Sequence, residues 1–211
     1  MSLPILVPVL CAIVALPAGG LAAALARPYA AAPSPVRLPV VMAATILAFA
    51  WAGLVMPPDW RLLAGLGLGW TLVCLATIDL IAFRLPDIFT LPLLVSGVAT
   101  ALVLPGRPIL EHGIGAVAGW TLLVALGWLY RRWRGVDGIG LGDAKLLAAG
   151  GAWLGWPALP SILLVACGVS LAWIAAGVLR GRRAGPSTPI AFGAPLCLAI
   201  WVVWLYGSLV T

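Results

Sequence analysis

The sequence predicts an all-α protein, a polytopic membrane helix bundle with about eight transmembrane helices. Of its 211 residues, 64% are hydrophobic and 9% are charged, whereas a soluble domain carries roughly 25% charged residues. Several apolar runs reach the ~20 residues that a helix needs to cross the hydrocarbon core. Because lipid cannot satisfy free backbone amides, and because these runs lack the alternation of barrel strands, they must be helices. A soluble protein is therefore excluded.

The apolar segments follow one another with short connections, and together they predict a single transmembrane domain over 1–211. A loop rich in proline and alanine separates the first two segments. The sixth is short for a full crossing, and its Gly150, Gly151 and Gly155 predict tight packing against neighbouring helices. Pro157 and Pro160 separate it from the seventh. The predicted segments are 3–26, 38–56, 61–82, 88–104, 112–130, 143–156, 158–179 and 190–210.

The basic residues are distributed unevenly between the two sides of these helices. Ten of the twelve fall in or beside odd-numbered connections, and only Arg61 and Arg107 fall in even-numbered ones. Since basic residues are enriched in cytoplasmic loops, the odd connections are predicted in the cytoplasm and both termini outside. The same bias accounts for the net charge of +6, so no nucleic-acid partner is expected. The ten are Arg27, Arg37, Arg84, Arg131, Arg132, Arg134, Lys145, Arg180, Arg182 and Arg183.

The four cysteines suggest neither a disulfide framework nor a metal site. Each lies inside an apolar run, and no two form a C-x-x-C pair. They are interpreted as small core hydrophobes. No basic stretch precedes the first apolar run, so a cleaved signal peptide is not expected. The cysteines are Cys11, Cys74, Cys167 and Cys197.

Among six acidic residues, Asp79 is the first candidate for a functional role. Asp59, Glu111 and Asp137 fall in connections, where a solvated or salt-bridged charge is expected. Asp79 instead lies in the last turns of the third predicted helix, flanked by apolar residues. A carboxylate at such depth is costly unless it is paired or faces a wet cavity, so it is a functional candidate by default. The alternative is an aspartate that snorkels or pairs two helices.

Asp143 is the second candidate, because it follows three alternating glycines at the start of the sixth predicted helix. The simpler interpretation is an N-cap, whose carboxylate accepts the free amide hydrogens of the first turn. The glycines of Gly138-Ile-Gly-Leu-Gly142 exceed what a cap needs. They permit close approach of another backbone, as in a protease that holds an extended peptide. The run lacks the spacing of a dinucleotide-binding fingerprint.

The predicted topology brings Asp79 and Asp143 to the same membrane face. The third helix ends, and the sixth begins, on the cytoplasmic side. Two close carboxylates do not easily both ionise, so they would share one proton and titrate as a pair. Aspartic proteases use this arrangement, with one carboxylate activating water and the other acting as an acid.

These motifs resemble those of the type IV prepilin leader peptidases, membrane aspartyl proteases of the GxGD type. Gly140-Leu-Gly-Asp-Ala-Lys145 matches the family pattern G-x-G-D-x-K. Ile78-Asp79-Leu80 and Leu85-Pro86-Asp87-Ile-Phe-Thr-Leu-Pro92 are similar to its first aspartate segment. Thr188-Pro-Ile-Ala-Phe-Gly-Ala-Pro195 resembles its P-F-G-P stretch. The resemblance covers roughly residues 65–205, is weaker over 1–60, and implies that Asp79 and Asp143 are the catalytic pair.

The other matched residues are expected to support the site or to contact substrate. Asp87, after Pro86, is expected to cap the fourth helix, with a role near the site as the alternative. Lys145, the only lysine, would tune Asp143, hold the glycine loop of Gly140 and Gly142, or anchor the helix at the membrane interface. The remaining candidates, for the peptide groove or for plain packing, are Pro189, Phe192 and Gly193.

The resemblance also implies a substrate and a location. The expected activity is an aspartic endopeptidase of the bacterial inner membrane, which removes the leader from type IV prepilins or type II secretion pseudopilins on the cytoplasmic side. Such leaders are short and basic, end in glycine and precede an apolar helix. Membrane lipid is the other expected partner, and no metal or other cofactor is expected.

One feature of the family pattern is missing. Bifunctional members carry, after their first helix, an insert with two zinc-binding C-x-x-C pairs, and they also N-methylate the trimmed pilin. The loop Arg27 to Val36 contains no cysteine. A short member is therefore expected, with the peptidase activity and without the methyltransferase.

Two other functions compete with this one. A presenilin or signal-peptide-peptidase type of intramembrane protease shares G-x-G-D, but carries tyrosine before its first aspartate, where this chain has Ile78. A non-enzymatic, ion-coupled carrier would use the buried aspartates as a proton pathway. Ion transport that survives conditions blocking proteolysis would identify the carrier.

Overall fold

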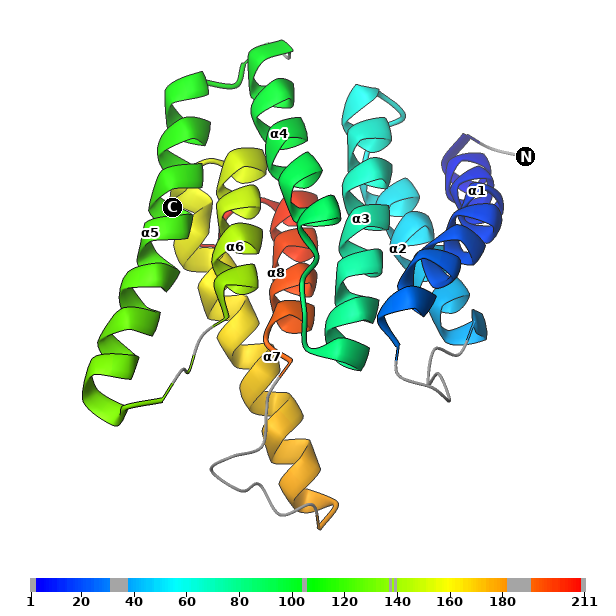
Figure 1. Ribbon diagram of the computed structural model, residues 1–211. Coiled ribbons are helices and arrows are strands. Elements are labelled where there is room, and N and C mark those ends of the chain that lie inside the picture. Colours follow the sequence, from blue (N-terminus) through cyan, green and yellow to red (C-terminus); the bar gives the residue numbers. More distant parts are fainter. Residues whose placement is uncertain are drawn as a thin grey trace. The chain divides into compact units, whose positions relative to one another are not determined.

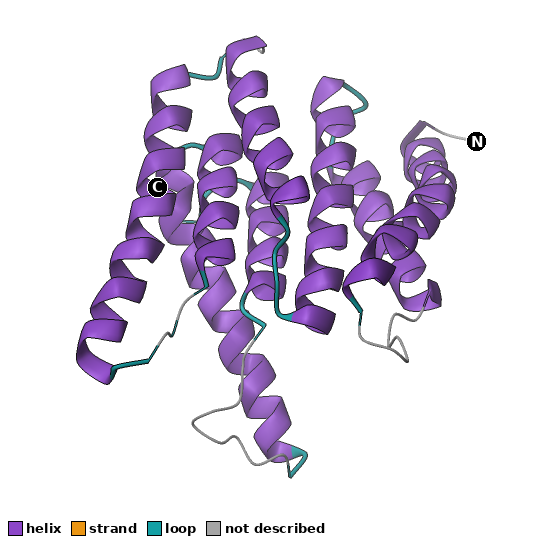
Figure 2. Cartoon of the chain, in the orientation of Figure 1, coloured by secondary structure: helices purple, strands orange, loops and turns teal. Residues whose placement is uncertain are grey.

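A computed structural model describes residues 3–30, 38–103, 106–136, 138, 140–181 and 191–209. Within these ranges every regular element is a helix (Figure 2). Two short 3₁₀ turns, Arg27–Tyr29 and Trp156–Ala158, accompany the α-helices. The α-helices are α1 (Leu3–Ala26), α2 (Leu38–Val55), α3 (Trp60–Ala82), α4 (Asp87–Val103), α5 (Ile109–Arg134), α6 (Leu141–Leu154), α7 (Leu159–Leu179) and α8 (Gly193–Tyr206).

These helices confirm the predicted class, an all-α, multi-pass membrane protein. Each predicted segment corresponds to one helix, and their ends differ by at most four residues. Five helical stretches are long and apolar enough to cross a membrane, and α4 and α8 are shorter apolar helices. The described chain forms two compact units, Met1–Ala82 and Phe83–Thr211, so the single domain stays a prediction.

Unit 1, residues 1–82, contains α1, α2 and α3. Close contacts at two glycines show that α1 and α2 pack antiparallel: a Cβ at Gly19 would lie 2.8 Å from Met42 Cα, and a Cβ at Gly53 would lie 2.8 Å from Pro8 Cα. Such small residues let helix backbones approach closely in lipid. Trp70 on α3 donates its indole N–H to the Ala18 carbonyl over 2.9 Å, which ties α3 to α1.

Unit 2, residues 83–211, is built around α6, which is buried from Ala144 to Trp153 except at Lys145. Helix α5 runs antiparallel to it, because Gly119 approaches the Leu147 carbonyl and Gly115 approaches Gly151. Helix α8 runs parallel to it, since Ile200 packs on Gly150 and Trp204 meets Trp153 edge-on at 5.4 Å. Figure 1 shows α6 with α4, α5 and α8 around it. The glycines confirm the tight packing predicted for the sixth helix.

The last backbone carbonyls of α6 accept hydrogen bonds from polar side chains of the α4–α5 region. Arg107 donates to the Trp153 carbonyl over 3.0 Å, and His112 Nδ1 donates to the Ala152 carbonyl over 2.8 Å. The final carbonyls of a helix have no partner within it and carry partial negative charge, so N–H donors and a cation suit this end. Gly155 ends the helix with φ +82°. No local pattern in the sequence predicts this function for Arg107 or His112.

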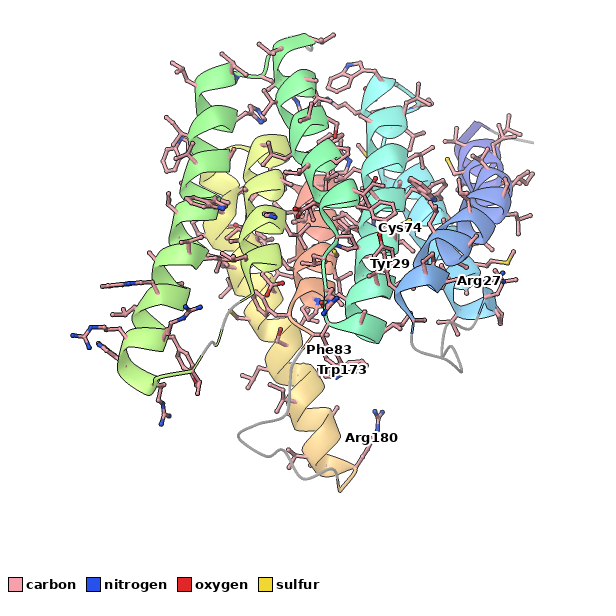
Figure 3. The ribbon with its side chains drawn as sticks, in the orientation of Figure 1. Arg27, Tyr29, Cys74, Phe83, Trp173 and Arg180 are labelled. Atoms are coloured by element: carbon pink, nitrogen blue, oxygen red, sulfur yellow. The ribbon has the colours of Figure 1, made fainter. Side chains whose placement is uncertain are left out.

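The second half of α7 carries large apolar side chains that are exposed. Leu171 is 68% exposed, Trp173 67% and Leu179 87%. Trp173 and Arg180 lie on the lower part of α7, below the ends of α6 and α8 in the view of Figure 3. Such a surface suits a helix in contact with lipid tails, which are as apolar as leucine itself.

Candidate active site

Asp79 lies in the last turn of α3 and is only 5% exposed. Its neighbours on the same helix, Cys74, Leu75 and Ile78, are fully buried. Among the described residues, Asp79 is the one carboxylate in the buried class. Burial of a carboxylate is expensive, so packing alone does not account for an acid at this position. The predicted location within the third helix is confirmed, because α3 continues to Ala82.

The chain leaves α3 through a residue in an uncommon conformation. Phe83 has φ +52° and is the one described non-glycine residue with a positive φ. This left-handed region is strained for a bulky side chain. Phe83 is 52% exposed and is labelled in Figure 3. Strained residues of this kind cluster at functional sites.

Asp143 occupies the third position of α6, not the N-cap position. The helix begins at Leu141, and Gly140 is its N-cap, with no side-chain cap hydrogen bond. The Asp143 amide donates to the Gly140 carbonyl over 3.1 Å. The N-cap alternative for Asp143 was therefore wrong. The carboxylate is partly exposed and stands in the first turn of a helix, where the aligned peptide dipoles favour negative charge.

The three glycines before Asp143 have different surroundings. A Cβ at Gly138 would collide with the Tyr130 ring, and a Cβ at Gly142 would lie 2.9 Å from Leu85 Cβ. Among the described residues, a Cβ at Gly140 would meet only Asp143 Oδ2 at 3.5 Å and the Gly142 nitrogen at 3.9 Å. Close packing therefore requires Gly138 and Gly142, whereas Gly140 leaves space beside the carboxylate.

Asp87 is the first residue of α4, and its carboxylate has a partner on another helix. The Pro86 carbonyl accepts hydrogen bonds from the amides of Phe89 and Thr90, so Pro86 is the residue that precedes the first turn. The Asp87 carboxylate instead accepts a hydrogen bond from Lys145 Nζ over 2.6 Å. The expected cap at Asp87 is thereby corrected. Lys145 is partly exposed, and its partner was not predicted from the sequence.

The structure describes only residues 191–195 of the C-terminal motif, which spans residues 188–195. Phe192 is half-buried at the N-cap position of α8, and its carbonyl accepts the Leu196 amide over 3.1 Å. Gly193 is buried as the first residue of that helix. Pro189 lies outside the described residues. The expected groove function of these residues stays a prediction.

The three acidic residues that were assigned to connections differ in their surroundings. Asp59 is a cap of α3, because its Oδ1 accepts the Arg61 amide over 2.8 Å and the Leu62 amide over 3.4 Å. Glu111 is exposed in the first turn of α5. Asp137 lies outside the described residues. The position of Asp59 just before an apolar run was the signal for this cap.

The motif residues of unit 2 lie close to one another in the structure. Among the described residues, no group of three histidine, cysteine or acidic side chains could hold a metal ion. Within unit 2, the fold brings Asp87 to Lys145 and Leu85 to Gly142, beside Asp143. Asp79 belongs to unit 1, and its surroundings are described within that unit alone.

The fold and these motifs define a multi-pass helical membrane protein with Asp79 in unit 1 and Asp143 in unit 2. Residues 66–175, which include Asp79 and Asp143, match the Type IV leader peptidase family. The chain belongs to this family.

Curated relatives carry the name prepilin leader peptidase/N-methyltransferase. The protein from Aeromonas hydrophila is 41% identical over 180 residues, which is 85% of this chain and 62% of that relative. The protein from Dickeya chrysanthemi is 40% identical over 165 residues, covering 77% and 57%. The protein from Klebsiella pneumoniae is 45% identical over 130 residues, covering 62% and 57%. The chain thus spans about three fifths of the length of these relatives. No solved structure matches it.

Proposed function

We propose that this chain is an aspartic endopeptidase that removes the leader peptide from type IV prepilins or type II secretion pseudopilins. The observation that carries the proposal is the pair of aspartates, Asp79 and Asp143, inside the region that matches the family. The names of the relatives include prepilin leader peptidase, and the identity extends over most of this chain.

In the proposed reaction the two carboxylates divide acid and base catalysis. Asp143, at the amino end of α6, takes a proton from water, whose oxygen attacks the carbonyl carbon of the scissile peptide bond. Asp79 supplies a proton to the leaving amine as the C–N bond breaks. The base has then gained a proton and the acid has lost one, so a proton must return to Asp79 before the next cycle.

The proposed substrate has a short basic leader that ends in glycine before an apolar helix. The charge asymmetry of the connections supports an active site on the cytoplasmic side of a bacterial inner membrane, with both termini in the periplasm. A substrate helix in the same bilayer would present its cleavage site at this face. The proposal covers the peptidase alone, because the sequence has no C-x-x-C pair.

The proposal is tested by leader removal from a synthetic prepilin by the purified full chain in bacterial lipid. Asp79→Asn and Asp143→Asn should each lower the cleavage rate by roughly a thousand-fold or more, because each removes an essential catalytic group. Mass spectrometry of the product measures the cleavage and also detects any N-methylation.

Glu111→Gln is the matched control, because Glu111 is an exposed carboxylate in the first turn of α5. This variant should cleave at the wild-type rate. Thermal unfolding verifies that all three variants remain folded. Undiminished cleavage by either aspartate variant would refute the catalytic assignment, and ion transport without cleavage would favour the carrier.

A further inference from the structure

The segment that leads into α4, from Leu85 to Asp87, contacts the start of α6 at two points. Leu85 packs against Gly142, where an added Cβ would lie 2.9 Å from Leu85 Cβ. Two residues later, Asp87 accepts a hydrogen bond from Lys145 over 2.6 Å. Asp143 lies between the two contacted positions of α6.

Helix geometry shows what these two contacts control. Gly142 and Lys145 are three residues apart, so they lie on the same face of α6. Leu85 and Asp87 therefore hold one face of the first turn, and Asp143 projects from a different direction around the helix axis. A rotation of the turn would move the Asp143 carboxylate, and it would also separate Lys145 from Asp87.

The ion pair is exposed enough that global stability does not account for it. The side chain of Lys145 is 34% exposed and that of Asp87 is 56% exposed. Ion pairs this accessible to solvent contribute little to folding. A second link between the same two helices, from the Trp153 indole N–H to the Leu93 carbonyl over 2.8 Å, is buried and lies at the other end of α6. The two links thus differ in their distance from Asp143.

We propose that Asp87 and Lys145 are positioning residues, whose ion pair sets the rotation of the first turn of α6 and so the direction of the Asp143 carboxylate. This inference rests on the proposed function of Asp143. Neither residue takes part in bond making or breaking. Their effect should appear in kcat, because a misdirected carboxylate slows the chemical step, whereas substrate binding remains unchanged.

The test compares kcat and KM for leader removal in variants of the full chain. Lys145→Met and Asp87→Asn should each lower kcat about three- to six-fold with unchanged KM, a limit set by the modest energy of an exposed pair. The double variant should lose no more than either single variant, because both remove the same interaction. Lys145→Arg, which retains the charge and reach, should keep most of the activity.

Trp153→Phe is the matched control, because it removes the other α4–α6 link far from Asp143. It should lower the unfolding temperature and leave kcat unchanged. Equal kcat losses in Trp153→Phe and Lys145→Met, a KM effect alone, or wild-type kcat in Lys145→Met would each overturn the inference. Failure of the proposed function is distinguishable, since the wild-type chain would then show no cleavage, or Asp143→Asn would retain full activity.

Discussion

Gly140 is a residue whose backbone conformation does not require glycine. Its φ of −74° and ψ of 141° are extended values that any residue adopts. A Cβ there would meet Asp143 Oδ2 at 3.5 Å, an ordinary van der Waals contact. Folding therefore tolerates alanine at this position. What alanine would change is the access of water or a peptide to the carboxylate.

We expect Gly140→Ala to separate activity from stability. The methyl group should lower kcat/KM for leader removal by about ten-fold, because displacements of about 1 Å at a reacting centre are costly. The unfolding free energy should stay within about 0.5 kcal/mol of wild type, as for other surface substitutions. Cleavage kinetics and thermal unfolding measure the two effects.

Gly142→Ala provides the contrast to this variant. Its Cβ would lie 2.9 Å from Leu85 Cβ, so overpacking should destabilise the protein by about 1–3 kcal/mol. If Gly140→Ala lost stability to the same degree, the space beside Asp143 would have to be structural, and the interpretation of Gly140 would be wrong.

For single residues, the sequence predicted which side chains are functional candidates better than it predicted which side chains they contact. Asp79 was recognisable because an acid within an apolar helix is rare and costly. The Asp87–Lys145 pair was not, because its members are 58 residues apart and only the packing of α4 on α6 brings them together. The N-cap expected at Asp87 and the N-cap alternative for Asp143 were wrong by one and three positions, since several residues near a helix start compete for the cap.

At the scale of the elements, α6 depends strongly on its neighbours. With 14 residues it is ~21 Å long, shorter than the ~30 Å hydrocarbon core. The carbonyls at its carboxyl end have no partner within the helix, and Arg107 and His112 supply donors there. Its flanks meet α5 through glycines rather than large side chains. The element that carries Asp143 is thus fixed from several sides.

We expect the α5–α6 contact to be intolerant of a single methyl group. A Cβ at Gly115 would lie 2.5 Å from the Gly151 carbonyl oxygen, so Gly115→Ala should destabilise the protein by about 1–3 kcal/mol through overpacking. At Gly113, on the same helix, no atom of the described residues lies within 4 Å of an added Cβ. Gly113→Ala should be neutral or stabilise by up to about 1 kcal/mol, because alanine favours the helix.

Thermal unfolding of the two variants in detergent measures this difference. Each adds one Cβ to α5, so the change in helix propensity is shared and only the contact differs. Equal stability of Gly115→Ala and Gly113→Ala would contradict the close packing of α5 on α6.

The glycines and the short length of α6 were predictable from local sequence, because small residues and helix length are local properties. The donors at its carboxyl end were not. His112 and Ala152 are 40 residues apart, and Arg107 and Trp153 are 46 apart. A lone histidine and a loop arginine are compatible with many different partners, and only the tertiary packing selects these carbonyls.

For the molecule as a whole, the predicted orientation rests on charge. The prediction requires successive helices to run in alternating directions across the membrane, and the helix directions within unit 2 agree with this. Helix α6 is antiparallel to α5 and parallel to α8, and the ends of α4 and α6 that carry Asp87 and Lys145 lie together. Which end faces the cytoplasm does not follow from packing. The prediction that the end carrying Asp143 faces the cytoplasm rests on the excess of arginines at that end.

We expect single cysteines at the two ends of unit 2 to react from opposite sides of the membrane. In a background with the four native cysteines replaced by alanine, Val136→Cys and Leu209→Cys are suitable, because the native side chains are 58% and 59% exposed. In intact cells, a membrane-impermeant maleimide should label Leu209→Cys in the periplasm and leave Val136→Cys unlabelled. After permeabilisation of the inner membrane both should react, which controls for the reactivity of each thiol. Labelling of Val136→Cys in intact cells would reverse the orientation, and would move Asp143 to the periplasmic face.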